Sequence, residues 1–225
     1  MAGAWTAVRT RGAPEIRRKI GAGGEDENCR GEARFIGGPA SPPPLSMARN
    51  GYCLWFTGLP SAGKTTIAHA VAPLLRERGW NVEVLDGDEV RRGLSSDLGF
   101  DRAAREQHAA RVAFVAKVLA RNGAIPIVAL ISPYASSRAH ARQEIGRFVE
   151  IYVTTPLEVC EQRDVKGLYK KARQGLLREM TGVDDPYEVP AAPDIRIDTI
   201  HRTPEASAHY IVEELGRLGW TLDPR

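Results

Sequence analysis

The sequence predicts an α/β protein with a doubly wound parallel sheet. Short apolar runs suited to buried strands alternate with longer stretches of helical periodicity over most of the chain. One run, residues 125–131, is apolar almost throughout, as in a strand that is covered on both faces of a sheet. Repeated strand–helix units of this kind imply parallel strands, with ligands gathered where the strands end.

The first half of the chain begins with a strand, a loop and a helix. Residues 52–56 are an apolar run that predicts the first strand, and residues 65–78, rich in Ala and Leu, predict the first helix. Residues 82–85 predict the second strand. Residues 102–122 repeat apolar side chains at steps of three and four residues, which predicts a long amphipathic helix that ends at Gly123.

The second half repeats the same order. Strands are predicted over residues 125–131, 148–153 and 195–197, and a helix over residues 137–147. A closing amphipathic helix is predicted over residues 204–218, with Thr203 as its N-cap and Pro204 in its first turn.

Residues 1–46 are unlike the rest of the chain. They mix Gly, Pro, Arg and Glu without periodicity, and such a composition cannot bury enough apolar surface to offset its ordering entropy. They are predicted to be either a disordered N-terminal extension or the product of a start codon assigned too far upstream, because Met47 stands five residues before the first strand. Residues 47–225 are predicted to form the single folded domain.

Composition narrows the class of function. The chain has 225 residues and a formal net charge of +3, which is too small to indicate a nucleic-acid partner. Its three cysteines, Cys29, Cys53 and Cys160, lack metal-ligand spacing, and their odd number suggests no disulfide framework. No apolar run approaches the roughly 18 residues of a membrane span. A cytoplasmic protein without a membrane partner is therefore expected.

The loop after the first strand carries the most specific motif. Residues 58–65 fit G-x-x-x-x-G-K-[ST] between a predicted strand and a predicted helix, so backbone N–H groups and the helix dipole would surround a phosphate. This motif predicts a P-loop NTPase-type fold that binds ATP or GTP. Lys64 would reach the β- and γ-phosphates and Thr65 would offer its hydroxyl to Mg²⁺. The predicted nucleotide-binding residues are Gly58, Leu59, Pro60, Ser61, Ala62, Gly63, Lys64, Thr65 and Thr66.

Polar residues beside the second strand and on the long helix suggest an acceptor site. Asp88 and Arg91 would share one face of a helical turn, where the carboxylate could accept a hydroxyl proton and the arginine could hold an anion. The alternative for Asp88 is a helix N-cap. Arg105 and His108 continue the buried stripe of residues 102–122 and would point into a pocket, or form a satisfied structural pair.

Two further segments follow the third and fourth strands. Ser132 lies at the carboxyl end of a strand, where it would be either a capping hydroxyl or a ligand contact. Residues 160–173 form a basic run at the place where small-molecule kinases of this fold carry a mobile lid. A solvated charged face is the alternative for that run.

These segments together resemble the adenylylsulfate kinase (APS kinase) family. The resemblance covers residues 47–220 and is carried by residues 56–66, 85–91, 131–134 and 160–173, followed by residues 181–188. It implies a kinase domain that uses ATP and Mg²⁺ to phosphorylate the 3′-hydroxyl of adenosine 5′-phosphosulfate in sulfate assimilation. It also implies an ATP sulfurylase upstream, because the chain is too short to include one. A homodimer is one oligomeric state left open.

The resemblance also implies site residues. It places adenylylsulfate on Asp88, Arg91, Phe100, Arg105, His108, Ile131, Ser132, Lys166 and Met180. The catalytic set is Lys64, Asp88 and Ser132. The family's usual description makes the serine a phosphorylated intermediate. Since no base is evident beside Ser132, we expect it to position the substrate, and Asp88 to orient or deprotonate the hydroxyl.

The chain departs from the family pattern at several positions. Glu89, Arg92, His108 and Met180 stand where Asn, His, Asn and Phe are usual, and Pro60-Ser61 replaces Ser-Gly. Neither of these loop positions is a glycine of the motif, so phosphate binding is expected to survive. Two alternatives remain: a related kinase that acts on another small hydroxyl acceptor, and a catalytically silent nucleotide-binding subunit. The intact Lys64, Thr65 and Asp88 argue against the second.

Overall fold

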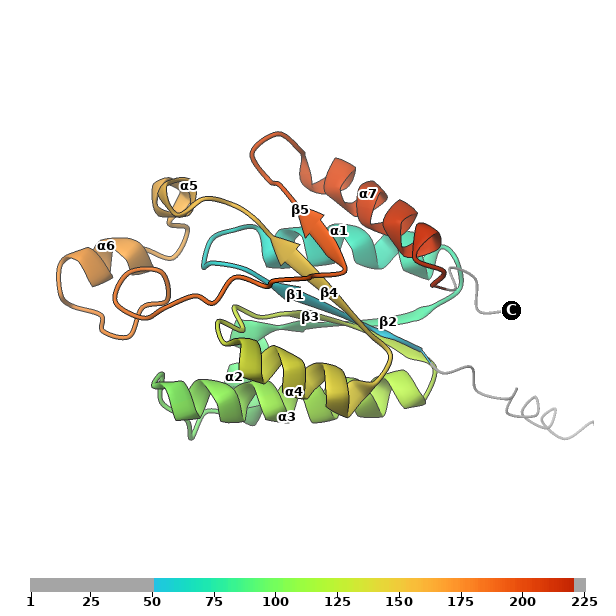
Figure 1. Ribbon diagram of the computed structural model, residues 1–225, viewed down its shortest axis with the longest axis horizontal. Coiled ribbons are helices and arrows are strands. Elements are labelled where there is room, and N and C mark those ends of the chain that lie inside the picture. Colours follow the sequence, from blue (N-terminus) through green and yellow to red (C-terminus); the bar gives the residue numbers. More distant parts are fainter. Residues whose placement is uncertain (1–50, 221–225) are drawn as a thin grey trace, which may run out of the picture. The chain divides into compact units, whose positions relative to one another are not determined.

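The described part of the chain is built on one parallel sheet. The computed structural model describes residues 51–220, and the predictions for residues 1–46 and Cys29 lie outside them. Five parallel strands are ordered β2-β3-β1-β4-β5, with helices on both faces (Figure 1). The P-loop NTPase-type, doubly wound fold predicted from the sequence is confirmed.

The elements alternate as predicted. The strands are β1 (Cys53–Thr57), β2 (Asn81–Asp86), β3 (Ala124–Ala129), β4 (Phe148–Val153) and β5 (Ile195–Ile197). The helices are α1 (Lys64–Arg76), α2 (Gly87–Leu94), α3 (Arg102–Arg121), α4 (Ala135–Ile145), α5 (Leu157–Arg163), α6 (Leu168–Arg173) and α7 (Pro204–Arg217). The bounds of β4 and β5 are the predicted ones. The N-cap of α7 is also confirmed, because the Thr203 hydroxyl accepts from the Ala206 N–H at 3.2 Å.

Each face of the sheet has its own apolar core. Helices α1 and α7 pack against one another on one face, and α3 and α4 on the other (Figure 1). Alternate residues of β1 point to opposite faces, so Leu54 and Phe56 join the first core and Trp55 joins the second. Cys53 and Cys160 are buried, as predicted.

The third strand is shorter than predicted. The sequence favoured residues 125–131, but β3 ends at Ala129. Beyond it the backbone turns toward the loop after β1, where the Ile131 carbonyl accepts from the Gly58 N–H at 3.4 Å and from the Thr57 hydroxyl at 2.7 Å. The apolar pattern could not show where pairing between strands would give way to these contacts.

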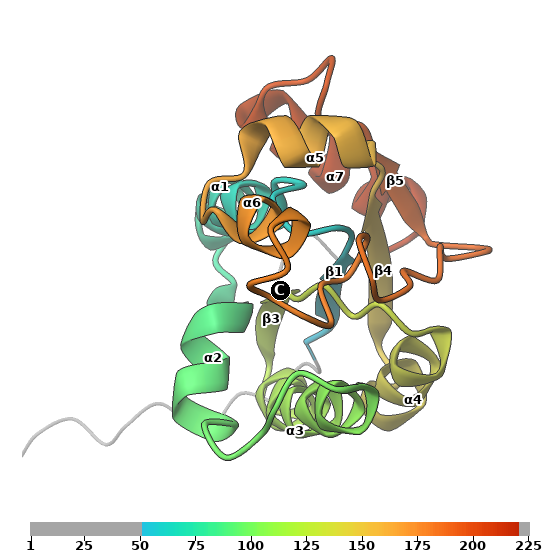
Figure 2. The ribbon, with the colours of Figure 1, turned by 90° about the vertical axis from the view of Figure 1, so that its left-hand side faces the viewer.

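The carboxyl ends of the strands open toward one end of this unit. Figure 2 views that end, where α2, α5 and α6 surround the strand tips. The segments that the sequence singled out therefore meet there. Within residues 51–220, no helix is both long and apolar enough to cross a membrane.

Candidate active site

The loop between β1 and α1 has the backbone geometry of a phosphate cradle. Gly58 and Gly63 have φ values of 151° and 103°, in the region that favours glycine. A Cβ at Gly58 would lie 2.8 Å from the Val153 carbonyl oxygen, so only glycine fits against β4. The two glycines of the motif thus adopt conformations that residues with a side chain resist.

The carbonyl groups of the loop are occupied by protein donors. Lys64 Nζ donates to the carbonyls of Gly58 and Leu59 at 2.9 and 2.7 Å. Tyr169 donates its hydroxyl to the Pro60 carbonyl at 3.1 Å. With these oxygens satisfied from within, the loop is held in a shape that can present its N–H groups to an anion at the start of α1.

Ser61 is the strained position of the loop. Its φ of 59° lies in the left-handed region, where a residue with a Cβ costs about 1–2 kcal/mol relative to its ordinary conformation. The sequence argument that Pro60-Ser61 is compatible with the loop did not anticipate this strain. The conformation itself persists, because the contacts at Pro60 and Ala62 hold the residues on either side.

Lys64 is buried with little compensating charge around it. Burial lowers its pKa to about 7, and the nearby Asp86 carboxylate opposes that shift only partly. A buried ammonium that lacks an anionic partner favours the arrival of phosphate oxygens, which would restore its usual basicity.

Thr65 and Asp86 provide the oxygen atoms expected of a magnesium site. The Thr65 hydroxyl donates to Asp86 Oδ2 at 2.7 Å, from the first turn of α1 to the carboxyl end of β2. Hydroxyl and carboxylate oxygens suit Mg²⁺, which retains several waters and binds nucleotide phosphates as well. No cluster of three or more His, Cys, Asp or Glu side chains able to hold a metal lies within residues 51–220. The residues present therefore fit a magnesium ion carried in with a nucleotide.

The N-cap of α2 is Asp86 rather than Asp88. Asp86 accepts from the N–H groups of Asp88 and Glu89, while Asp88 lies inside the helix. The N-cap alternative for Asp88 is therefore wrong, because the Asp88 carboxylate does not cap the helix. Instead it forms an ion pair with Lys166, which comes from the segment between α5 and α6. This contact joins the predicted lid to the predicted base.

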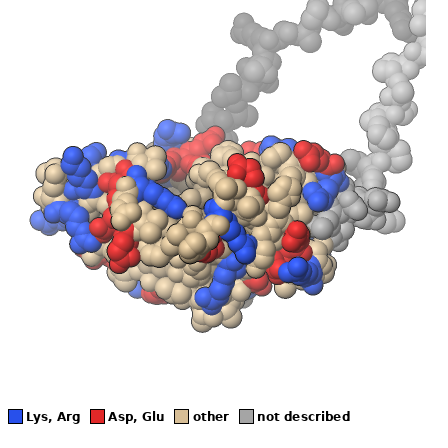
Figure 3. Space-filling model, turned by 90° about the horizontal axis from the view of Figure 1, so that it is seen from above, with Lys and Arg blue, Asp and Glu red and all other residues tan. Residues whose placement is uncertain are grey.

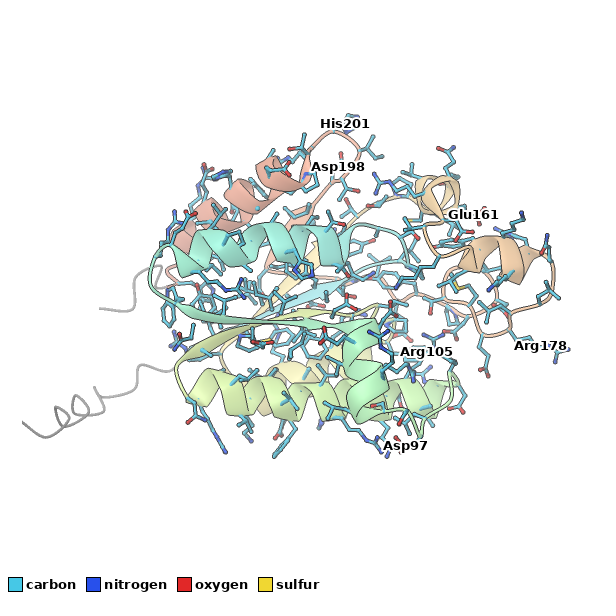
Figure 4. The ribbon with its side chains drawn as sticks, turned by 180° about the vertical axis from the view of Figure 1, so that it is seen from behind. Asp97, Arg105, Glu161, Arg178, Asp198 and His201 are labelled. Carbon is cyan, nitrogen blue, oxygen red and sulfur yellow. The ribbon has the colours of Figure 1, made fainter. Side chains whose placement is uncertain are left out.

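Arg91 and Arg105 flank the Phe100 ring. The Arg91 guanidinium lies 4.3 Å from the ring centroid and that of Arg105 lies 5.9 Å from it. Phe100 is 54% exposed, so part of this aromatic residue is open to solvent beside two cations. Arg105 also donates to the Phe100 carbonyl and, across the site, to the Glu179 carbonyl, each at 2.6 Å. In Figure 4 Arg105 lies at the same end of the molecule as Glu161 and Arg178.

His108 is buried between α2 and α3. Its Nδ1 lies 2.9 Å from the Ser95 hydroxyl, which is itself fully buried. Burial, reinforced by Arg91 and Arg111, lowers the pKa of His108 to about 4, so the ring is neutral at physiological pH. The bond to Ser95 favours the structural alternative for His108, and its place in a pocket stays a prediction.

Ser132 is buried and conformationally strained. It is 5% exposed, its φ is 42°, and its hydroxyl accepts from Trp55 Nε1 at 3.1 Å. No histidine, carboxylate or amine contacts its hydroxyl among the described hydrogen bonds. Ile131, its neighbour, directs its carbonyl to the Gly58 and Thr57 donors. This environment suits a positioning hydroxyl better than an activated nucleophile.

Met180 lies in the core on the α1 and α7 face of the sheet and is 5% exposed. Its backbone N–H donates to the Asp184 carboxylate at 2.6 Å. The structure thus places Met180 beneath the surface, on the segment whose Glu179 carbonyl binds Arg105. At 5% exposure Met180 offers little surface to a substrate, so its predicted contact with the nucleotide stays a prediction.

The predicted lid is a pair of short helices with a basic surface. Exposed Lys170, Lys171 and Arg173 lie on α6, at the left-hand end of the face in Figure 3 where Lys and Arg gather. The buried Tyr169 anchors α6 to the P-loop through its hydroxyl. The basic run is thus anchored at the strand tips rather than being only a solvated face.

Sequence reasoning missed several residues that shape this site. Asp86, Trp55 and Tyr169 each contact a predicted site residue or the loop. Asp86 had a readable signal, because it ends a strand at the sheet edge where ligands gather. The partners of Trp55 and Tyr169 lie 77 and 109 residues away in the chain, and no local pattern reports them.

Comparisons with known proteins agree with this geometry. Residues 50–198 match the family model described as adenylylsulphate kinase. An adenylyl-sulfate kinase from Synechococcus sp. (strain JA-3-3Ab) is 50% identical over 174 residues, which are 77% of this chain and 99% of that protein. A probable adenylyl-sulfate kinase from Pyrococcus abyssi is 49% identical over 170 residues, 76% of this chain and 98% of that protein.

A solved structure shows the same fold. The APS kinase CysC of Mycobacterium tuberculosis, in complex with AMPPNP and APS, superposes with a TM-score of 0.72 at 42% identity. The match covers 74% of this chain and 98% of that one.

Proposed function

The chain belongs to the adenylylsulphate kinase family, and we propose that it transfers the γ-phosphoryl group of ATP to the ribose 3′-hydroxyl of adenosine 5′-phosphosulfate. The products are ADP and 3′-phosphoadenosine 5′-phosphosulfate. One observation carries the proposal: Lys166 of the lid pairs with Asp88, which lies in the chain between two residues that reach the two sides of the site. Asp86, the N-cap of α2, is hydrogen-bonded to the first turn of α1, and Arg91, on the next turn of α2, stacks on Phe100. The start of α2 thus links the phosphate loop, the candidate base and the candidate base-stacking residue.

The donor side is the loop from Gly58 to Thr66. Its N–H groups and the Lys64 ammonium would hold the phosphates of ATP, as in other P-loop kinases. Thr65 and Asp86 would hold Mg²⁺, which when bound neutralises charge on the β- and γ-phosphates. Lys64 contributes most where charge develops during transfer, since it is buried and screened from water.

The acceptor side lies between α2, α3 and the lid. Phe100 would stack on adenine, because an open ring fits the face of a base without a hydrogen-bonding demand. Arg91, Arg105 and Lys166 would surround the phosphosulfate. His108, neutral and beside Arg91, would supply a hydrogen bond, and Ile131 would contribute apolar surface. Met180, which is 5% exposed, would support the site from the core.

The reacting hydroxyl needs orientation and a proton acceptor. We assign both to Asp88, whose exposed carboxylate caps nothing and faces the lid. Ser132 would donate a hydrogen bond to the acceptor, because its oxygen already accepts from Trp55 and its proton remains available. In-line transfer from ATP then requires positioning and charge neutralisation, with no covalent enzyme intermediate.

Three further expectations accompany this function. An ATP sulfurylase would supply the acceptor, the protein would act in the cytoplasm, and a homodimer is the oligomer that sedimentation should test first. These rest on the family resemblance and on the chemistry of the substrate.

A direct assay tests the function. Purified protein with Mg·ATP should release ADP when adenosine 5′-phosphosulfate is added, with one phosphate gained by the acceptor on mass spectrometry. Adenosine 5′-monophosphate, which lacks the sulfate, is the matched control and should be a poor acceptor. Equal turnover of the two nucleotides, or ADP release without an acceptor, would contradict the assignment.

A further inference from the structure

An arginine and a glutamate form a buried ion pair beneath the acceptor side. Arg138 on α4 and Glu150 on β4 have side chains that are 4% and 11% exposed, and Nε lies 2.8 Å from Oε1. Buried ion pairs contribute little to stability on average, because desolvation offsets most of the attraction. The contribution of this pair to stability therefore does not by itself explain why it is buried here.

The remaining nitrogens of Arg138 hold two separate pieces of backbone. Nη1 donates to the Ser132 carbonyl at 2.7 Å, and Nη2 donates to the Glu188 carbonyl at 2.6 Å. The planar guanidinium presents donors in a rigid fork, so these two carbonyls are held in one frame. A lysine could satisfy the charge of Glu150 but could not hold both carbonyls in that geometry.

The first piece of backbone is the strained turn at Ser132. A φ of 42° is costly for serine and persists only where surrounding contacts impose it. The Ser132 carbonyl accepts from Arg138 at 2.7 Å. It also lies 3.3 Å from the Thr57 hydroxyl, whose single proton is directed to the nearer Ile131 carbonyl at 2.7 Å. The bond from Arg138 therefore fixes the carbonyl of the strained residue.

The second piece is the segment that follows the lid. The Glu188 N–H donates to the Pro133 carbonyl at 2.8 Å, and its carboxylate accepts from the Ala135 N–H at 2.7 Å. Tyr134 donates to Asp185, with both carboxylate oxygens at 3.0 Å. The turn at Ser132 and the segment after the lid are therefore bound together, with Arg138 beneath them.

We propose that Arg138, oriented by Glu150, is a positioning residue for the phosphoryl acceptor. It sets the Ser132 hydroxyl and the segment leading from Met180 to Glu188 in one geometry without touching the substrate. The inference rests on the proposed function, since it assumes that both pieces face the acceptor. It concerns the acceptor and not ATP, because neither carbonyl belongs to the phosphate loop.

The test is the pair of variants Arg138→Lys and Glu150→Gln. Arg138→Lys should raise KM for adenosine 5′-phosphosulfate roughly 10- to 100-fold, the range for losing a hydrogen bond from a charged donor, and leave KM for ATP within about twofold. Glu150→Gln keeps the shape and the guanidinium, so it should shift the same constant in the same direction by less. It also serves as the second variant if Arg138→Lys does not fold.

Arg142→Lys is the matched control. Arg142 lies one turn further along α4, 3.5 Å from the other Glu150 oxygen and 2.7 Å from Asp194, and no described contact joins it to Ser132. This variant should alter thermal stability while leaving KM for the acceptor unchanged. If it raises that KM as much as Arg138→Lys does, the pair acts through general stability and the inference fails.

Two readouts separate positioning from stability. In a double-mutant cycle, Ser132→Ala and Arg138→Lys together should cost little more than the worse single variant, because both act on the same hydroxyl. Fully additive effects would overturn the inference. Amide hydrogen exchange of Arg138→Lys should speed up at both residues 132–135 and 185–188, but not at the phosphate loop.

The exchange experiment requires no substrate, so it separates two kinds of failure. If the wild-type protein does not phosphorylate adenosine 5′-phosphosulfate, the proposed function fails. Exchange at the two segments still decides whether Arg138 holds them together. Unchanged exchange at either segment would refute the positioning role.

Discussion

Replacing Ser132 with alanine should have two separable effects, one on stability and one on catalysis. The variant removes the acceptor of the Trp55 Nε1–H group, and Trp55 is fully buried. A buried donor left without a partner costs about 1–3 kcal/mol. For a domain of this size each kcal/mol lowers Tm by roughly 2–4 °C, so we expect a loss of several degrees.

The double variant Trp55→Phe/Ser132→Ala distinguishes the two effects. Replacing both partners by apolar groups removes the orphaned donor, so much of the lost stability should return, less whatever the smaller phenylalanine ring gives up in packing. Activity should not return, because the serine hydroxyl is still absent. Thermal melts and a coupled assay of ADP release, run on wild type, both single variants and the double variant, measure the two quantities independently.

The size of the catalytic loss tests the mechanism. A hydroxyl that only positions the acceptor should cost roughly 10- to 100-fold in kcat/KM when removed. An obligatory nucleophile would leave the variant without measurable turnover, and wild type given ATP alone would accumulate phosphoserine at position 132. Detection of that phosphoserine in rapidly quenched reactions, discharged by added acceptor, would refute the positioning role.

Four other predictions concern the phosphate loop and the candidate base. Lys64→Ala should lower kcat by about 10²–10³, because it removes a charge-stabilising donor; more than a tenth of wild-type kcat would contradict its role. The pKa of Lys64 is about 7, so about nine in ten free enzyme molecules carry a neutral Lys64 at pH 8. Binding of Mg·ATP at pH 8 should therefore take up about 0.9 proton, and its affinity should fall as the pH rises above 7. Calorimetry in two buffers of different ionisation heat measures the proton uptake. Ser61→Gly should raise Tm by up to about 6 °C, since it relieves about 1–2 kcal/mol of left-handed strain against a glycine entropy cost of roughly 0.5–1 kcal/mol. Ser61→Ala, which keeps the strain, is the control and should not stabilise. Asp88→Asn should lower kcat more than Ser132→Ala, and the reverse order would remove Asp88 as the proton acceptor.

Much of the fold was predictable because it is encoded locally. The strands of a sheet covered on both faces are short apolar runs, and the boundaries of β4 and β5 follow from that pattern alone. Thr203 and Pro204 define the start of α7 by the chemistry of helix ends. The glycines of the phosphate loop can be recognised in the sequence, because no other residue adopts their backbone conformation without cost.

The candidate site was less predictable, because its parts are joined by contacts that are distant in sequence. The sequence does not show which carboxylate of Asp86 and Asp88 caps α2, since both stand at plausible positions and only the backbone decides. The strain at Ser61 was not predicted either, because the glycine that the family usually has at that position is not one of the glycines of the motif and was treated as dispensable. The identity of the capping residue affects function, since Asp86 is also the carboxylate bonded to Thr65.

The same reasoning explains why Arg138 escapes sequence analysis. Beside Ser136 and Ser137 it reads as an ordinary helix residue, and its partners Glu150 and Glu188 belong to other elements. Its informative feature is the combination of burial, a carboxylate partner and two carbonyl acceptors. A guanidinium in this position restricts the backbone conformation of both the turn at Ser132 and the segment after the lid. An enzyme that transfers a phosphoryl group mainly by positioning needs such rigidity beneath its acceptor, because a small displacement of the hydroxyl there would cost rate.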